Sequence, residues 1–189
     1  LVYLSTDYVF DGERGNYKES DPAYPVNFYG LTKLVAEEVV RASGLLHAII
    51  RTSAIYGVGL GKLNFATFVA DRLRSGEEVM ALCDQYVSPT LNTQLARAIA
   101  ELAEARLIGT FHIAGDRTSR YEFAKKLARA LGLPEDLIKP AKMEEMKWIA
   151  RRPKDSSLSC EETRKKLKTD FHSMSYALET LKKEYEEEK

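Results

Sequence analysis

The first 55 residues constrain the fold more than any other part of the sequence. Residues 1–6 are apolar and partly β-branched and end in polar side chains, residues 29–42 repeat apolar side chains at helical spacing, and residues 47–55 form a second apolar run. This order predicts a strand, a helix and a second strand. Strands joined through a helix pair in parallel with a right-handed crossover. The sequence therefore predicts an α/β fold with a buried parallel sheet.

The later segments predict further helices and strands, and the pattern weakens after Pro134. Helices are expected at residues 65–74, 91–105 and 119–131, the last one capped by Ser119 and ended by Gly132. Short strands are expected at residues 78–82 and 109–114. Further along, we expect a short helix at 142–148, irregular chain at 151–159 and helical segments at 160–167 and 173–188.

The charge balance argues against several classes of partner. The chain has 189 residues with 28 basic and 28 acidic side chains, so its formal net charge is zero. Proteins that bind nucleic acid or anionic membranes normally carry an excess of Lys and Arg, and no apolar run approaches the ~18 residues of a membrane span. Cys83 and Cys160 lie far apart, and only three histidines are present. We therefore expect a cytoplasmic globular protein without a disulfide framework, a metal site, a membrane span or a nucleic-acid partner.

Tyr29 and Lys33 form the sharpest candidate for chemistry. They are four residues apart and share one helix face, so the ammonium group can favour the ionised form of the phenol. A phenol with an ordinary pKa of about 10 needs such help to exchange a proton near neutral pH. The spacing alone is weak evidence, because Tyr121 and Tyr185 also precede a lysine by four residues.

The context of Tyr29 separates it from the other two tyrosines. It opens the crossover helix between two strands that end in Ser5-Thr6 and Thr52-Ser53. Ligands of open α/β sheets bind beyond the carboxyl ends of the strands, so these hydroxyl groups and the start of the helix should converge on one site. Tyr121 and Tyr185 lack such a partner strand and are expected to be surface or half-buried helix positions.

An ordered series of short motifs resembles the dTDP-4-dehydrorhamnose reductases, which are extended short-chain dehydrogenases/reductases. The motifs cover nearly the whole chain and are Ser5-Thr-Asp-Tyr-Val-Phe-Asp-Gly12, Tyr29-Gly-Leu-Thr-Lys33, Arg51-Thr-Ser53 with Tyr56-Gly57, Asn64-Phe65, Asp84-Gln85 with Pro89-Thr90, and Arg152-Pro153 with Ser157-Leu158. The resemblance implies the C-terminal part of a Rossmann-type doubly wound parallel sheet in residues 1–56. It implies a small α/β substrate-binding region mainly in residues 57–189, from which some segments can return to the sheet.

The resemblance implies a role for each matching residue. Tyr29 would donate a proton to the ketone oxygen, Lys33 would lower the pKa of that phenol and hold the nicotinamide ribose, and Thr6 would hydrogen-bond the substrate oxygen. The nicotinamide would be backed by Thr52, Ser53 and Ala54, and the substrate would be contacted by Asp7, Tyr8, Asn64 and Arg152.

Some of these residues also have a purely structural interpretation. Asp7 can cap a turn, Asn64 can cap a helix, Thr52 to Ala54 can simply end a strand, and Arg152 can be solvated. Two positions depart from the family pattern: Ala54 stands where many members have an aromatic residue, and Val87 where glycine is common. Both departures concern substrate recognition more than hydride chemistry.

The implied activity is NADPH-dependent reduction of a 4-keto-6-deoxy nucleotide sugar in dTDP-rhamnose biosynthesis. The cofactor would be NADP, with NAD as the alternative, the partner a nucleotide sugar, and the assembly a homodimer. One alternative is a nucleotide-sugar epimerase or dehydratase, which keeps NAD as a temporary hydride store. Another is a non-catalytic regulatory subunit with the same fold.

The glycine-rich dinucleotide fingerprint of the family is absent from the chain. Residues 57–62 read GVGLGK, which is neither GxGxxG nor a P-loop. The chain also opens on Leu1 inside a predicted strand. We therefore expect that these residues are the C-terminal portion of a longer reductase and are inactive on their own.

Overall fold

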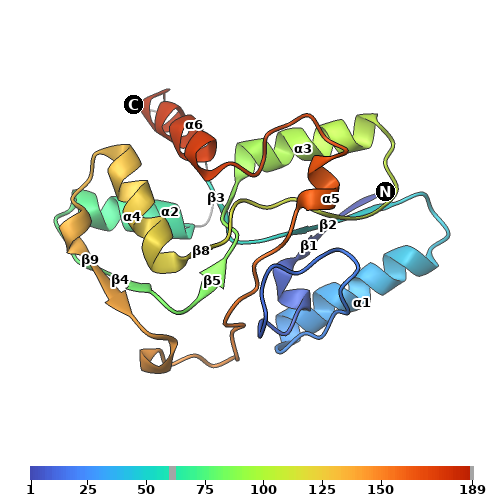
Figure 1. Ribbon diagram of the computed structural model, residues 1–189, viewed down its shortest axis with the longest axis horizontal. Coiled ribbons are helices and arrows are strands. Elements are labelled where there is room, and N and C mark those ends of the chain that lie inside the picture. Colours follow the sequence, from blue (N-terminus) through green and yellow to red (C-terminus); the bar gives the residue numbers. More distant parts are fainter. Residues whose placement is uncertain (60–62, 188–189) are drawn as a thin grey trace.

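The computed structural model describes residues 1–59 and 63–187 and confirms the predicted strand, helix and strand at the start of the chain (Figure 1). Strand β1 (Val2–Thr6) leads through helix α1 (Phe28–Ala42) to strand β2 (Ala48–Thr52). β2 pairs in parallel with β1 on one side and with β7 (Gly109–His112) on the other. The order β1-β2-β7 makes β2 the central strand, which explains why every residue of β2 is buried.

Helices cover both faces of this sheet. Ile50 of β2 packs in one apolar cluster with Leu102 of helix α3 (Asn92–Glu104). Arg51 points to the opposite face, because side chains alternate along a strand, and there it binds Glu37 of α1. α1 and α3 therefore lie on opposite faces, as in a doubly wound α/β sheet.

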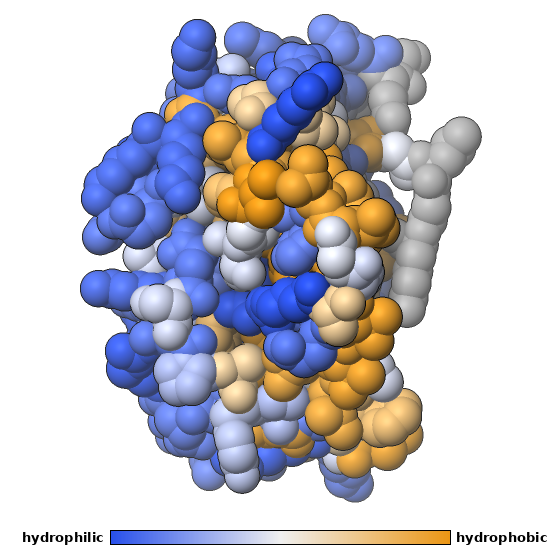
Figure 2. Space-filling view, turned by 90° about the vertical axis from the view of Figure 1, so that its right-hand side faces the viewer, coloured by the Kyte–Doolittle hydropathy of each residue, from blue (hydrophilic) through white to orange (hydrophobic). Residues whose placement is uncertain are grey.

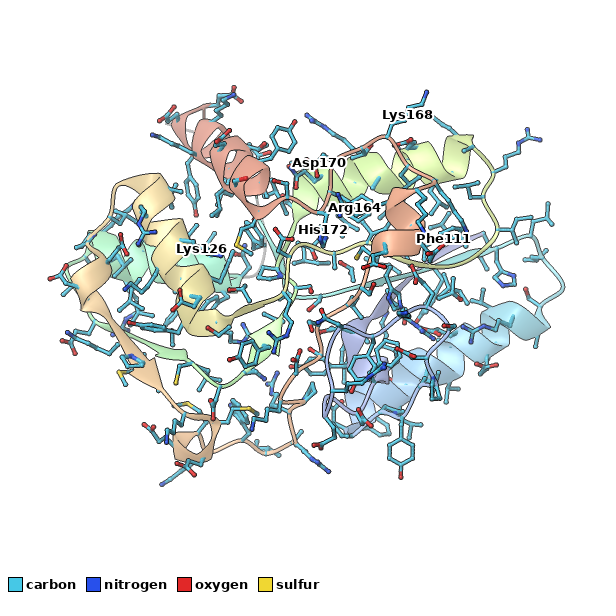
Figure 3. The ribbon with its side chains drawn as sticks, viewed as in Figure 1. Phe111, Lys126, Arg164, Lys168, Asp170 and His172 are labelled. Atoms are coloured by element: carbon cyan, nitrogen blue, oxygen red, sulfur yellow. The ribbon has the colours of Figure 1, made fainter. Side chains whose placement is uncertain are left out.

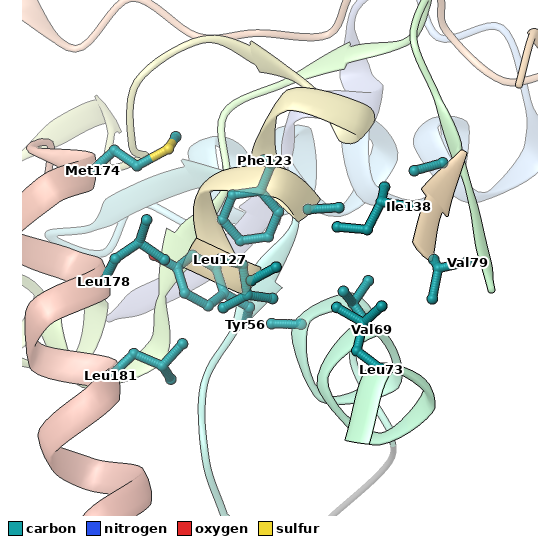
Figure 4. Close-up of a cluster of buried hydrophobic side chains, with 14 of the residues drawn as sticks. Tyr56, Val69, Leu73, Val79, Phe123, Leu127, Ile138, Met174, Leu178 and Leu181 are labelled. Atoms are coloured by element: carbon teal, nitrogen blue, oxygen red, sulfur yellow. The ribbon is translucent and has the colours of Figure 1, made fainter. Parts of the chain in front are cut away.

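A smaller α/β unit lies beside the three-stranded sheet. It contains the parallel pair β4 (Val79–Leu82) and β9 (Ile138–Ala141), and the helices α2 (Phe65–Arg74), α4 (Arg120–Leu131) and α6 (Met174–Glu187). Their apolar side chains form one cluster, in which Phe123 and Leu127 of α4 lie between the other two helices (Figure 4). The α/β fold class predicted from the sequence is confirmed.

Short elements connect the two parts of the molecule. β3 (Ile55–Tyr56) pairs in parallel with β6 (Thr90–Leu91), and β5 (Tyr86–Val87) pairs antiparallel with β8 (Thr118–Ser119). The remaining turns of helix are η1 (Asp7–Val9), η2 (Glu135–Leu137), η3 (Met143–Glu145) and α5 (Glu161–Arg164). These connections carry segments distant in sequence to the carboxyl edge of the sheet.

Most element boundaries follow from local capping and backbone geometry. α1 begins at Phe28, one residue earlier than predicted, because the Asn27 side chain caps it. α4 has the predicted Ser119 cap and ends at Gly132, where φ is +68°. The predicted strand at 47–55 is interrupted after β2, because Ala54 has a φ of +41°, outside the strand region.

The weakest predictions lie in the C-terminal third. The helix expected at 142–148 is only η3, and the one expected at 160–167 is only α5. Residues 151–159 are irregular, as predicted, apart from isolated bridges. α6 ends at Glu187, the last described residue. β9 was not predicted because Pro140 interrupts its strand pattern. The sheet tolerates this proline because β9 is an edge strand of a two-stranded pair.

Apolar side chains are exposed on the face that holds the starts of β1 and β2 (Figure 2). Leu1, Val2, Leu46 and Ile108 line an apolar cavity of about 210 Å³ there, at the amino end of the sheet. Among residues 1–59 and 63–187, β1 pairs only with β2, so its second edge is unpaired. In the same residues, no helix is long and apolar enough to cross a membrane.

Candidate active site

A cleft of about 430 Å³ lies at the carboxyl ends of β1 and β2. Six separate segments of the chain line it, with the residues Thr6, Asp7, Tyr8, Asn27, Phe28, Tyr29, Ala54, Val87, Arg120, Ala150 and Arg152. The end of a strand and the start of the crossover helix therefore do meet at one site, as the sequence predicts. Tyr121 and Tyr185 do not line this cleft.

Tyr29 lies in the first turn of α1 and is half-exposed to the cleft. Its ring meets the ring of Tyr8 edge-on, with the centroids 5.9 Å apart. Within the described residues, no side chain or backbone group hydrogen-bonds the Tyr29 hydroxyl, so this phenol is available to a ligand.

The start of α1 is held in place by two neighbours of Tyr29. Asn27 Oδ1 accepts a hydrogen bond from the Gly30 N–H at 2.9 Å, and its Nδ2 donates to the Arg151 carbonyl at 3.0 Å. Gly30 lies so close to η1, the turn that follows β1, that a Cβ atom there would be 2.1 Å from the Tyr8 carbonyl oxygen. Only glycine permits this approach, which brings Tyr29 beside the end of β1.

Lys33 lies one helical turn after Tyr29. Its ammonium group donates a hydrogen bond to the Leu4 carbonyl of β1 at 2.7 Å and lies 4.7 Å from the centre of the Tyr3 ring. These contacts fix the lysine between α1 and the last residues of β1. Lys33 does not itself line the cleft.

Thr6 and Asp7 form a buried polar link at the floor of the cleft. Thr6 Oγ1 donates to Asp7 Oδ1 at 3.0 Å, and Asp7 Oδ2 accepts from the hydroxyls of Ser53 and Ser156. Burial raises the pKa of Asp7 above its usual value, and the three hydroxyl donors oppose that shift. Asp7 therefore ties β1, the end of β2 and the C-terminal third together, and Thr6, not Asp7, caps the following turn.

The three residues expected behind a nicotinamide occupy different environments. Thr52 and Ser53 are buried, and Thr52 Oγ1 contacts the Thr90 hydroxyl at 3.3 Å while Ser53 binds Asp7. Ala54 alone lines the cleft. Its positive φ turns the chain away from β2 and leaves a methyl group at the wall.

Asn64 lies away from the lining of the cleft. Its Oδ1 accepts from the backbone N–H groups of Ala66 and Thr67, and its Nδ2 donates to the Gly57 carbonyl at 2.8 Å. Its interpretation as the cap of α2 is thus confirmed, and contact with a substrate stays a prediction. Residues 60–62, at the end of the GVGLGK turn, lie outside the described residues.

Two arginines line the cleft, and the sequence predicted only one of them. Arg152 Nη1 donates to the Tyr8 hydroxyl at 3.3 Å. Arg120, the first residue of α4, is half-buried, and its Nε donates to Gln85 Oε1 at 2.7 Å. No motif or spacing marks Arg120 in the sequence, because only the packing of α4 brings its first turn to the sheet.

A second polar cavity, of about 400 Å³, contains none of the predicted site residues. It is lined by Asp116, Arg164 and His172 among others, and Figure 3 labels Arg164 and His172. His172 Nε2 lies 3.0 Å from Asp116 Oδ1, and its Nδ1 lies 3.0 Å from the Ala114 carbonyl oxygen, so both ring nitrogens are engaged. In the described part of the chain, no group of three acidic, His or Cys side chains is placed to hold a metal ion.

A parallel α/β sheet with Tyr29 and Lys33 on the crossover helix beside its carboxyl edge defines a Rossmann-type α/β fold, which solved dehydrogenase and reductase structures share. Residues 1–187 match the family model of the RmlD substrate binding domain. The chain belongs to this family, which confirms the resemblance seen in its motifs.

Curated relatives support this assignment at about one-third identity. The chain is 34% identical over 163 residues to a probable low-salt glycan biosynthesis reductase of Haloferax volcanii, in a match that covers 84% of this chain and 54% of the relative. It is 33% identical over 169 residues to methionine adenosyltransferase 2 subunit beta of Bos taurus, covering 85% of this chain and 50% of the relative. The chain thus spans about half the length of the curated relatives it matches.

A solved structure shows the same fold. The dTDP-4-dehydrorhamnose reductase of Bacillus anthracis, crystallised in complex with NADP, is 33% identical to this chain and superposes with a TM-score of 0.88. The match covers 96% of this chain and 64% of the bacterial reductase.

Proposed function

We propose that the protein is an NADPH-dependent reductase of a 4-keto-6-deoxy nucleotide sugar, as in dTDP-rhamnose biosynthesis. The observation that carries this proposal is the unpartnered Tyr29 phenol at a cleft on the carboxyl edge of a Rossmann-type sheet. The names of the Haloferax and Bacillus relatives, both reductases, support it.

The residues of the cleft fit the nicotinamide end of such a cofactor. Tyr29 and Ala54 line one cavity, and Ala54 leaves room at its wall for a flat ring. NADPH, when bound, supplies the hydride that reduces the ketone carbon. Tyr29 and Lys33 would hold its ribose, whereas the glycine-rich pyrophosphate turn of the family is absent from this sequence. NAD is the alternative cofactor.

Tyr29 performs the acid step of the proposed reaction. As hydride reaches the carbonyl carbon, the phenol proton passes to the carbonyl oxygen and the ketone becomes an alcohol. Lys33, held by the Leu4 carbonyl, keeps a positive charge one helical turn from Tyr29. Thr6 donates its single hydroxyl hydrogen to Asp7, so it must turn from Asp7 before it can donate to the substrate oxygen.

We also assign residues 1–56 to the dinucleotide-binding part and residues 57–189 mainly to substrate binding. One later segment belongs with the dinucleotide-binding part, and the pairing of β7 with β2 in the sheet of β1 supports this exception. Nucleotide sugars and NADPH are cytoplasmic metabolites, which is the basis for placing the protein in the cytoplasm. A homodimer is the proposed assembly.

Replacement of the phenol tests the proposal. In the complete protein, Tyr29→Phe should lower NADPH oxidation with a 4-keto-6-deoxy nucleotide sugar about 100- to 1,000-fold, because the acid is lost. Tyr121→Phe is the matched control, because Tyr121 also precedes a lysine by four residues and Lys125 Nζ lies 5.6 Å from the centre of the Tyr121 ring. The Tyr121→Phe variant should oxidise NADPH at the rate of the parent protein. Full turnover by Tyr29→Phe would refute the role of Tyr29.

A non-catalytic regulatory subunit is the second candidate. The observation that favours it is the identity to a protein named as a subunit of methionine adenosyltransferase 2. The same assay separates the two functions, because a regulatory subunit would not oxidise NADPH with any nucleotide sugar. Tyr29→Phe would then leave its effect on the partner enzyme unchanged. A nucleotide-sugar epimerase or dehydratase would instead show no net consumption of added NADPH.

A further inference from the structure

Arg120 stands at the boundary between two cavities. It lines the cleft that contains Tyr29, and it also lines a neighbouring cavity of about 270 Å³ bounded by Phe65 and Trp148. Its guanidinium carbon lies 5.2 Å from the centre of the Phe65 ring, a distance at which a cation is attracted to the ring face. The side chain is therefore held on the wall between the two cavities.

Arg152 lines the same two cavities. Its guanidinium carbon lies 5.7 Å from the Trp148 ring centre, and its Nη1 donates to the Tyr8 hydroxyl. Tyr8 also interacts with Arg120. Two guanidinium groups thus gather around one phenol at the junction of the two cavities.

Neither guanidinium is neutralised by a carboxylate. In residues 1–59 and 63–187, no Asp or Glu oxygen lies within 4.0 Å of Arg120 or Arg152. The nearby Asp7 carboxylate is occupied by three hydroxyl groups. Burial lowers the pKa of Arg120, and its interactions with the Tyr8 side chain and the Asp7 carboxyl oppose this shift. A half-buried guanidinium without a counter-ion is suited to an anionic ligand.

One buried amide holds both arginines in place. Gln85 Oε1 accepts from Arg120 Nε at 2.7 Å, and Gln85 Nε2 donates to the carbonyl oxygen of Pro153, the neighbour of Arg152, at 3.2 Å. Gln85 is only 2% exposed. Gln85 lines the second cavity as an uncharged amide, so it brings no charge to a ligand. Its hydrogen bonds instead hold the Arg120 side chain and the backbone next to Arg152.

We infer that Arg120, together with Arg152, binds the diphosphate of the nucleotide-sugar substrate, and that Gln85 is the positioning residue of this pair. The inference rests on the proposed function. In a nucleotide sugar the charged diphosphate lies between the sugar and the flat base. In this protein the arginine pair likewise lies between two cavities, one for each end of such a ligand. The sugar then enters the cleft of Tyr29, and the base lies toward Phe65 and Trp148.

Binding of thymidine diphosphate to the complete protein, measured by calorimetry without NADPH, tests the inference. Arg120→Met should weaken binding about 10- to 100-fold, because it removes a charge-assisted hydrogen bond in a partly desolvated site. Arg120→Lys should recover part of the loss, since it keeps the charge without the planar fork. Arg97→Met is the control, because Arg97 is an exposed arginine of α3 and its loss should change nothing.

Gln85→Leu separates positioning from general damage to the fold. It should weaken thymidine diphosphate binding several-fold while leaving the affinity for thymidine, which has no phosphate, unchanged. A variant that had merely lost structure would lose both affinities equally, and this outcome would overturn the positioning role.

Two results would overturn the assignment of Arg120. One is an Arg120→Met variant that binds thymidine diphosphate as the parent does. The other is a variant that keeps this affinity but loses binding of a uronic acid, which would assign Arg120 to a sugar carboxylate. Either outcome is distinct from failure of the proposed reductase, which would appear as nucleotide binding without NADPH oxidation in the parent protein.

Discussion

Gly30→Ala probes how the start of α1 is placed against β1. Gly30 is the third residue of α1, and a Cβ atom there would lie 2.1 Å from the Tyr8 carbonyl oxygen and 2.9 Å from Pro25 Cβ. An ordinary contact between non-bonded heavy atoms is about 3.5 Å. The start of α1 must therefore move away from η1, which follows β1, by about 1.4 Å to accept one methyl group.

The sign of the change in the free energy of unfolding shows which of two effects dominates at Gly30, the steric overlap with Tyr8 or the higher helix propensity of alanine. In an unobstructed helix, Gly→Ala stabilises by about 1 kcal/mol. At Gly30 the steric overlap costs about 1–3 kcal/mol and reverses the sign. Because a displacement of about 1 Å can lower a rate about 100-fold, the same variant should lose most of the proposed reductase activity.

Urea unfolding and NADPH oxidation measure the two effects on the same samples. Gly44→Ala is the control, because Gly44 has a φ of +73° but, among the described residues, no neighbour within 4 Å of the point where a Cβ atom would lie. It should cost about 1 kcal/mol through backbone strain alone and leave activity intact. A Gly30→Ala protein as stable as the parent, with full turnover, would refute the reasoning.

Three further variants test the buried contacts. Glu37→Gln should lower the free energy of unfolding by about 3–5 kcal/mol, because it leaves the buried Arg51 guanidinium unpaired. Burial would raise the pKa of Glu37, but Arg51 holds this pKa below its usual 4.5. The stabilisation by this ion pair should therefore be fully present above pH 4.5. In acid unfolding it should disappear as the pH falls through the lower pKa that Glu37 has in the folded protein. Leu181→Ala should cost about 2–5 kcal/mol in urea unfolding, since Leu181 is fully buried between α6 and α4. Ser119→Ala should cost about 1 kcal/mol in the same assay by removing the cap of α4; an unchanged midpoint in any of these experiments would contradict the corresponding contact.

The sequence predicted the sheet and its crossover helix because their signals are local. Apolar β-branched runs, a helical repeat and the Ser119 and Gly132 boundaries each involve neighbouring residues. The structure has each of them, although β2 ends three residues before the predicted end of its strand. β9 was not predicted because it depends on pairing with β4, which lies far away in the sequence. Ile138 of β9 pairs with Val79 of β4, 59 residues earlier. Such pairing leaves no periodic pattern in a four-residue segment that contains proline.

The site shows the same division between local and distant information. Tyr29 and Lys33 were predicted from their spacing and from the strand ends beside them. Arg120 was not, because its place at the cleft depends on Gln85 and on the packing of α4 against another part of the chain. The sequence also allowed two interpretations of Asp7, as the cap of a turn or as a contact to the substrate. In the folded chain, the Asp7 carboxylate accepts hydrogen bonds from hydroxyl groups of two distant segments.

By itself, the sequence determined the α/β class, the reductase family and the tyrosine that lines the cleft, because these rest on periodicity and on motifs of adjacent residues. Only the tertiary structure decided that two unpaired arginines lie between two cavities and that Gly30 sets the distance from α1 to β1. Charge pairing and steric contact depend on which surfaces meet, and those surfaces belong to segments far apart in the chain.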